Sequence, residues 1–328
     1  MNVKKLTEAS LLSAAFVVLS TAFIGMGFGY FGYIDFVVPV LTAVIYLRCG
    51  FKYTVLSSIT SLILIICVLG NIPSAILMSQ SMIYGIICAF IIPSKKNIMD
   101  DLFISSILAC IIMIIIDFNF SNLIGYSVIT QCREQVNEAA HMVALYLGSG
   151  YALTKEYLNI VFYLLIISLP VGTMIITYIF SIILGKKFEF LNENSMKKYK
   201  IIRNFRKFGV LIACSMNVIM TAVIIVISGK LLLMIPIIKG TAYIEILINS
   251  ITYVCYFFLI QDSISTINKS LYVLTHSRIL TMIGQLIILI TLINYFRIVL
   301  PVMVIGAVLV EYVLGIKKRQ IYYLSKFV

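Results

Sequence analysis

Long apolar runs with few or no charges constrain this chain more than any other feature of its sequence. Ten such runs lie along the 328 residues, and most approach the roughly 20 residues that an α-helix needs to cross a bilayer. The bilayer core has no water to satisfy exposed backbone groups, and the runs lack the strict alternation of barrel strands, so each is predicted to be a helix. The predicted spans cover residues 6–26, 33–47, 53–69, 74–92, 102–119, 158–184, 208–228, 242–260, 279–295 and 299–314.

The composition indicates the same class of protein. Hydrophobic residues make up 62% of the chain and charged residues 12%, whereas soluble domains average about 45–50% and about 25%. We therefore expect an all-α, polytopic integral membrane helix bundle with about ten transmembrane helices. Two details stay open. The span at 33–47 is short and contains Pro39, and residues 231–238 form either a re-entrant or interfacial piece or part of a span.

The basic residues predict how the bundle is oriented, because cytoplasmic loops carry an excess of Lys and Arg. With a cytoplasmic N-terminus, ten spans place 20 of the 25 basic residues in cytoplasmic segments and return the C-terminus to the same side. The net charge of +12 therefore reflects short clusters between apolar runs, and we expect no nucleic-acid partner. The five basic residues predicted to lie outside are Arg133, Lys155, Lys230, Lys239 and Arg297.

Two segments between the apolar runs are too polar to be spans. Residues 129–156 mix Glu134, Glu138 and His141 with apolar residues, which is typical of an amphipathic helix lying at the outer surface. Residues 186–207 hold eight basic residues and are predicted to be a cytoplasmic linker held against anionic headgroups. The linker separates a six-span membrane core over residues 1–185 from a four-span membrane region over 208–328. The basic, apolar start is predicted to be an uncleaved first helix, because it leads into further spans.

Ionisable residues beside membrane spans are costly and are therefore candidates for function. Asp35, Asp117 and Glu245 are all predicted to lie at similar depth near the outer leaflet, where they would make an acidic site for a cationic or amine-bearing ligand. The alternative is that each carboxylate marks a helix end in the headgroup region, as Asp35 and Glu245 would near helix N-termini. Among the uncharged polar residues, we expect Gln80 to face a ligand, because it lies deep in the span at 74–92.

No enzyme motif is present. His141 and His276 are predicted on opposite sides of the membrane, and no HExxH, GxSxG, Walker or GxGxxG pattern occurs. The seven cysteines show neither pairing nor metal-ligand spacing. We therefore expect no catalysis, no cofactor and no metal site. Without a P-loop, any coupling to ATP must come from a partner.

Short motifs mark both ends of the chain in a fixed order: LTEASLLSAA at 6–15, Pro39, RCGFK at 48–52, then Gln261, Asp262, Arg278, Pro301, Gly306 and KKR at 317–319. This order resembles the YybS-like family of bacterial multi-span membrane proteins. The resemblance covers nearly the whole chain in span order. It implies a multi-pass protein of the bacterial cytoplasmic (inner) membrane.

That family is in turn similar to the substrate-binding S components of energy-coupling-factor transporters. Those proteins bind vitamins or metal ions and associate with a T-type membrane subunit and two ATPases. The resemblance implies that small residues on the first helix contact the T-type subunit. It also implies that residues 129–156 lie over a ligand pocket in an S-like core. The small residues at the matching positions are Ala9 with Ser13 and Ser10 with Ala14.

Two functions remain from the sequence. The first is a substrate-binding or transport-related component of the membrane that takes up a small-molecule ligand and depends on a partner for energy. The second is a non-transport membrane scaffold or regulator of cell-envelope assembly, which would use the same helices only to bind protein partners. A buried cavity lined by Asp35, Gln80, Asp117 or Glu245 would favour the first.

Overall fold

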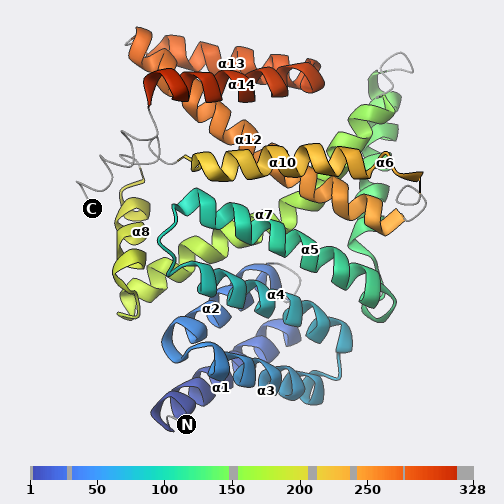
Figure 1. Cartoon of the computed structure of the whole chain (residues 1–328). Coiled ribbons are helices and arrows are strands. Elements are labelled where there is room, and N and C mark those ends of the chain that lie inside the picture. The colour runs from blue at the N-terminus through green and yellow to red at the C-terminus, as the bar shows by residue number, and fades with distance from the viewer. Residues whose placement is uncertain are drawn as a thin grey trace.

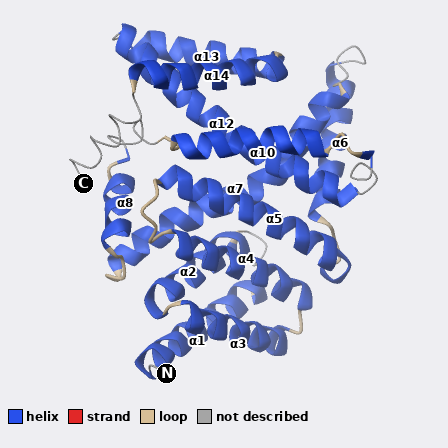
Figure 2. Ribbon diagram, in the orientation of Figure 1, coloured by secondary structure: helices blue, strands red, loops and turns tan. Residues whose placement is uncertain are grey.

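A computed structural model of the chain describes residues 3–27, 32–147, 154–205, 213–236, 242–275 and 278–315. Within these ranges the regular elements are helices and no strand is present (Figure 2). The chain is therefore a helical protein, and the long apolar helices indicate a membrane protein. Six helices are long and apolar enough to cross a bilayer: α1 (Val3–Gly25), α3 (Phe51–Leu69), α4 (Ile72–Ile91), α5 (Ile98–Ile124), α7 (Lys155–Lys187) and residues Ala242–Leu271 of α12.

The remaining described helices are shorter or more polar. Three of them, α10, α13 and α14, carry apolar stretches of 10–17 residues. The others are a short π-helix, a 12-residue helix that follows it directly, and two amphipathic helices. Their bounds are η2 Tyr33–Val37, α2 Val38–Cys49, α6 Val128–Leu147, α8 Glu193–Arg203, α10 Met216–Leu232, α13 Arg278–Asn294 and α14 Phe296–Leu314; α12 extends over Ala242–Thr275.

The helices stack in the order of their contacts. Helices α1 to α4 pack together, α5 and α7 form the middle of the molecule, and α12 packs on both of them and on α10, α13 and α14 (Figure 1). Most of the largest fully buried side chains of the main core come from α7 and α12, among them Ile166, Met174, Tyr178 and Val254. The four-span region predicted from the sequence therefore packs directly on the first part of the chain.

Small residues bring helices close together in the first part of the chain. Ser13 on α1 donates to the carbonyl of Ser57 at 3.3 Å and bonds to the Ser61 hydroxyl at 2.6 Å on α3. A β-carbon added at Gly85 on α4 would lie 2.3 Å from the Pro39 carbonyl oxygen on α2. Such close approach of helix backbones is typical of packing between membrane helices.

The two ends of the long helices differ. Helix α6 directly precedes α7 and α8 directly follows it, so these two amphipathic helices lie at opposite ends of α5 and α7 (Figure 1). We call these ends the α6 end and the α8 end.

At the α8 end, acidic side chains tie three helices together. The backbone N–H of Ser215, the N-cap of α10, donates to Asp100 at 2.8 Å, and that of Cys214 donates to Asp262 on α12 at 2.9 Å. Acids at this position satisfy N–H groups that α10 itself cannot pair and interact favourably with the helix dipole. These two carboxylates are thus structural anchors for the start of α10.

A second buried cluster at the α8 end fixes α8 itself. The Lys198 ammonium donates to Asp101 at 2.5 Å and to the Ile92 carbonyl at 2.9 Å. Asp101 also accepts from the Tyr178 hydroxyl on α7 and from Ser94, both at 2.7 Å. Burial lowers the pKa of the Lys198 ammonium, and its hydrogen bond and ion pair with Asp101 oppose that change. The segment predicted to be a cytoplasmic linker held against anionic headgroups is therefore anchored to the helix bundle by one of its own bases.

The predicted spans match the helices closely but not everywhere. The short second span is divided into η2 and α2, with Pro39 in the first turn of α2, where proline fits a helix. The eighth continues well beyond residue 260, as α12 ends at Thr275. Within 231–238, two leucines close α10 and residues 233–235 form a turn. Residues 237 and 238, the start of the seventh span, Lys239, His276 and the basic motif at 317–319 lie outside the described residues.

Candidate functional site

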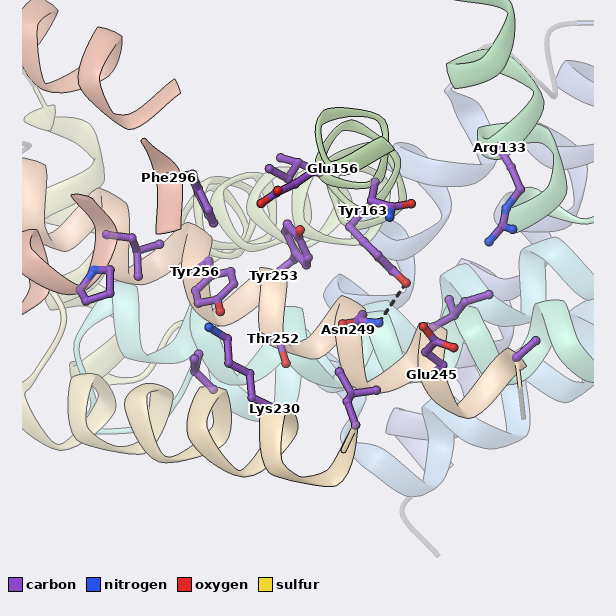
Figure 3. Close-up of a pocket in the computed structure, with 18 residues that line it drawn as sticks. Arg133, Glu156, Tyr163, Lys230, Glu245, Asn249, Thr252, Tyr253, Tyr256 and Phe296 are labelled. Atoms are coloured by element: carbon purple, nitrogen blue, oxygen red, sulfur yellow. Dashed lines mark hydrogen bonds between the residues drawn. The ribbon is translucent and has the colours of Figure 1, made fainter. Parts of the chain in front are cut away.

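A cavity of about 710 Å³ lies at the α6 end, where α6, α7, α10, α12 and α14 meet (Figure 3). Its volume falls within the range of about 300–1,000 Å³ that ligand pockets occupy. We call it the charged cavity, because its wall contains four charged side chains: Arg133, Glu156, Lys230 and Glu245. It lies between the six-span and four-span parts predicted from the sequence.

One face of α12 forms the floor of the charged cavity. Glu245, Asn249, Thr252, Tyr253 and Tyr256 all line it, and their spacing of three and four residues brings them to one side of a helix. The face is polar at its start and aromatic farther along. The apolar residues expected on a buried helix face are thus partly replaced by hydrogen-bonding groups, as in a binding site.

Aromatic rings form a continuous row along the cavity wall. Tyr163 of α7 stacks on Tyr253 with centroids 5.0 Å apart, and Tyr253 meets Tyr256 edge to face at 5.6 Å. Phe296 of α14 extends the row, again edge to face at 5.6 Å from Tyr256. The Asn249 amide donates to the Tyr163 hydroxyl at 3.0 Å, which ties α12 to α7 (Figure 3). These contacts hold the wall in a fixed shape.

The two bases of the cavity rest on aromatic rings instead of on acids. The Arg133 guanidinium lies 4.8 Å from the centroid of the Phe162 ring, and the Lys230 ammonium lies 5.8 Å from that of Tyr256. Neither base forms an ion pair with a described residue. The Glu245 carboxylate accepts no hydrogen bond from a described residue. Figure 3 shows Arg133 and Glu245 toward one end of the row and Lys230 toward the other. Charges of both signs are therefore left to interact with a ligand.

The sequence-predicted acid Asp117 positions α6 and lies outside the cavity wall. Asp117 is 3% exposed, and its carboxylate accepts hydrogen bonds from the Ser127 hydroxyl at 2.7 Å and from the Val128 N–H at 2.6 Å, at the first turn of α6. It thereby holds the helix that carries Arg133.

Cys132 faces the core from the same helix, and burial raises the pKa of its thiol, so it lacks the thiolate of a nucleophile.

Of the other sequence-predicted site residues, one lines the charged cavity and two lie in the first part of the chain. Glu245 lines the charged cavity, but Asp35 is exposed in the first turn of η2. Gln80 donates to the Tyr84 hydroxyl at 2.8 Å, and that hydroxyl donates to the Ala109 carbonyl of α5 at 3.1 Å. Gln80 thus takes part in a link between α4 and α5. The four residues are not brought together in one site.

The small residues of α1 divide between two faces. Ala9 and Ser13 are buried, and Ser13 bonds to α3, whereas Ser10 and Ala14 are exposed. Only the second pair is therefore open to another helix.

Several residues of the cavity were not predicted from the sequence to bind a ligand. Arg133 and Lys230 were predicted only to lie on the outer side of the membrane. Asn249 was not predicted to face a ligand. The recurrence of Glu245, Asn249 and Tyr253 every four residues along α12 is a signal that could have identified this face. Among the described residues, no three His, Cys, Asp or Glu side chains cluster as metal ligands would.

No protein-family model, curated protein or solved structure matches this chain. Its function is therefore inferred from the arrangement of its own residues.

Proposed function

We propose that this chain is a multi-pass membrane protein that binds a small ligand in the charged cavity and acts in transport with a partner that supplies energy. The observation that carries the proposal is the cavity itself, about 710 Å³ in volume, with a wall of stacked aromatic rings and with Arg133, Lys230 and Glu245 in no ion pair with a described residue. Charges within a membrane protein are costly and are retained where they serve a function. A pure scaffold has no need of such a cavity.

The proposed orientation places the charged cavity at the outer face of a bacterial cytoplasmic membrane. Ten of the described helices would span it: α1, α2 with η2, α3, α4, α5, α7, α10, α12, α13 and α14. The basic residues support this orientation, because α8 and the neighbouring end of α7 carry Lys186, Lys187, Lys197, Lys200 and Arg203. Under the positive-inside rule this α8 end is cytoplasmic, and so are both termini.

Capture of the ligand would use α6, because it supplies Arg133 to the cavity and is held to α5 by Asp117. Passage of the ligand would need a partner, since no ATP-binding motif is present in the sequence. The proposed partner is a T-type membrane subunit with ATPases. Ser10 and Ala14, on the exposed face of α1, are the proposed contact with that subunit.

The proposal is tested by identifying what the purified protein carries. The protein is extracted from its native membranes in mild detergent, and small molecules released by organic solvent are identified by mass spectrometry. We expect one compound to be enriched over the total membrane extract, and Arg133→Met to lose it. Gln80→Leu, outside the cavity, is the matched control and should retain it. A wild-type protein without any enriched compound contradicts the proposal.

The proteins that accompany the chain in the same preparation test the partner. We expect a T-type subunit and ATPases, and fewer of them when Ser10 and Ala14 are both replaced by Phe. Recovery of wall-synthesis or division proteins instead would favour the scaffold or regulator of envelope assembly.

A further inference from the structure

A second, apolar cavity adjoins the charged cavity. It has a volume of about 330 Å³ and lies between α7, α12 and the start of α14. We call it the apolar groove. It shares Ile160, Tyr253, Tyr256 and Phe296 with the charged cavity, so the two differ in polarity and meet along one wall. Beyond these shared residues the groove is lined by aliphatic and aromatic side chains, except for Gln261.

The groove has the length and exposure that a hydrocarbon chain requires. It follows α12 from Tyr253 to Ile264, which at about 1.5 Å per residue is a rise of about 16 Å. One leaflet of the hydrocarbon core is about as thick, since the whole core measures about 30 Å. Leu164 on α7 lines the groove and is 46% exposed, so the groove reaches the lateral surface of the bundle.

We propose that the ligand is a membrane amphiphile whose zwitterionic headgroup, a phosphate joined to an amine, lies in the charged cavity and whose hydrocarbon chain lies in the apolar groove. This inference rests on the proposed function and names its substrate class. A wholly polar ligand would leave the groove unused, and a wholly apolar one would leave Arg133, Lys230 and Glu245 without an ion pair.

The charges determine the headgroup. Arg133 and Lys230 provide two positive groups, and guanidinium and ammonium groups both bind phosphate oxygens. Glu245 provides a carboxylate, which accepts hydrogen bonds from an ammonium group. Because the charges of the wall that lack an ion pair are of both signs, a headgroup with one charge of each sign is matched, whereas a purely anionic headgroup meets the Glu245 carboxylate. Like charges placed together disfavour binding of the wrong partner.

The chain lacks Trp, so one introduced Trp reports on a single place. Leu164→Trp places it in the groove, and Leu169→Trp, equally exposed at 49% on the same helix, is the matched control. Each variant is reconstituted in bilayers of equal parts phosphatidylethanolamine and phosphatidylglycerol. In one sample only the first lipid has brominated acyl chains, and in the other only the second. Bromine quenches a Trp that it touches, while the lipid composition stays constant.

We expect the groove Trp to be quenched more strongly when phosphatidylethanolamine is brominated, and the control Trp to be quenched equally in both samples. Glu245→Gln should reduce the lipid preference at the groove about tenfold, the effect of losing one charge-assisted hydrogen bond. The comparison of the two brominated lipids in the protein that retains Glu245 tests the proposal even if the Glu245→Gln variant does not fold. Equal quenching in both samples, or stronger quenching by phosphatidylglycerol, overturns the proposal.

A soluble headgroup separates this proposal from the proposed function. Glycerophosphoethanolamine, which has the same charges and no acyl chain, is added to the purified protein, and its binding is measured by calorimetry. Binding of this compound with no lipid preference in the groove would overturn the amphiphile and leave the proposed function standing. If glycerophosphoethanolamine does not bind, the groove shows no lipid preference and the native preparation contains no enriched compound, then the amphiphile proposal and the proposed function are both overturned.

Discussion

Removal of Lys198 is the perturbation whose effect the structure specifies most fully. Its ammonium lies 2.5 Å from Asp101, and the side chains of the two residues are 6% and 0% exposed. Lys198→Met leaves the Asp101 carboxylate buried without its counter-charge. The hydrogen bonds from Tyr178 and Ser94 to that carboxylate remain, both at 2.7 Å.

Breaking a buried ion pair by removing one partner costs about 3–5 kcal/mol. Because two donors still solvate the carboxylate, we expect the lower end of this range, about 3 kcal/mol. At about 1.4 kcal/mol per tenfold, the unfolding equilibrium should change by about a hundredfold. Lys198→Met combined with Asp101→Asn should recover most of the loss, because no unpaired charge is then buried.

Unfolding in mixed micelles of increasing SDS content, followed by circular dichroism, measures this change in free energy. Lys197→Met is the matched control, since Lys197 is the adjacent base on α8 and is exposed. We expect it to change the free energy of unfolding by less than about 0.5 kcal/mol. A value for Lys198→Met no larger than that of the control would refute the inference that this ion pair anchors α8.

Three further predictions follow from single contacts. Asp117→Ala removes the acceptor at the start of α6 and should cost about 1 kcal/mol, measured by the same SDS unfolding. Gly85→Ala should cost about 1–3 kcal/mol, because its β-carbon would meet the Pro39 carbonyl at 2.3 Å, whereas Gly172→Ala, with open space, should be neutral or stabilising. Burial lowers the pKa of Lys198, so the unfolded chain binds more protons than the folded one between that lowered pKa and about 10.4. The contribution of Lys198 to the free energy of unfolding should therefore increase with pH across that window, and this increase should vanish in Lys198→Met. An unchanged pH dependence in the variant would contradict this prediction.

The helical class could be read from the sequence because it depends on local properties. A run of about 20 apolar residues specifies a membrane helix without reference to the rest of the chain. The amphipathic segment at 129–156 likewise predicts a helix, and the structure has α6 over Val128–Leu147. Helix ends that depend on distant residues were harder to predict. The start of α10 at Met216, for example, is held by Asp100 and Asp262 from two other helices.

The candidate site was predicted only in part, because it depends on which helix faces meet. Glu245 lines the charged cavity, and an acid at the start of a span is conspicuous in a sequence. Asp117, an acid at the end of a predicted span, is equally conspicuous, but its carboxylate accepts hydrogen bonds from Ser127 and from the first turn of α6. Lys198 lies in a run of bases that normally indicates a solvated surface, and only its contact with Asp101 distinguishes it. Such pairings are tertiary and leave no local pattern.

The most direct test of the ligand site is a cryo-electron microscopy map of the protein extracted from its native membranes into lipid nanodiscs. The account predicts elongated density that begins between Arg133 and Glu245 and continues past Tyr253 toward Leu164. A charged cavity that contains only solvent, or one closed by its own side chains, would contradict it.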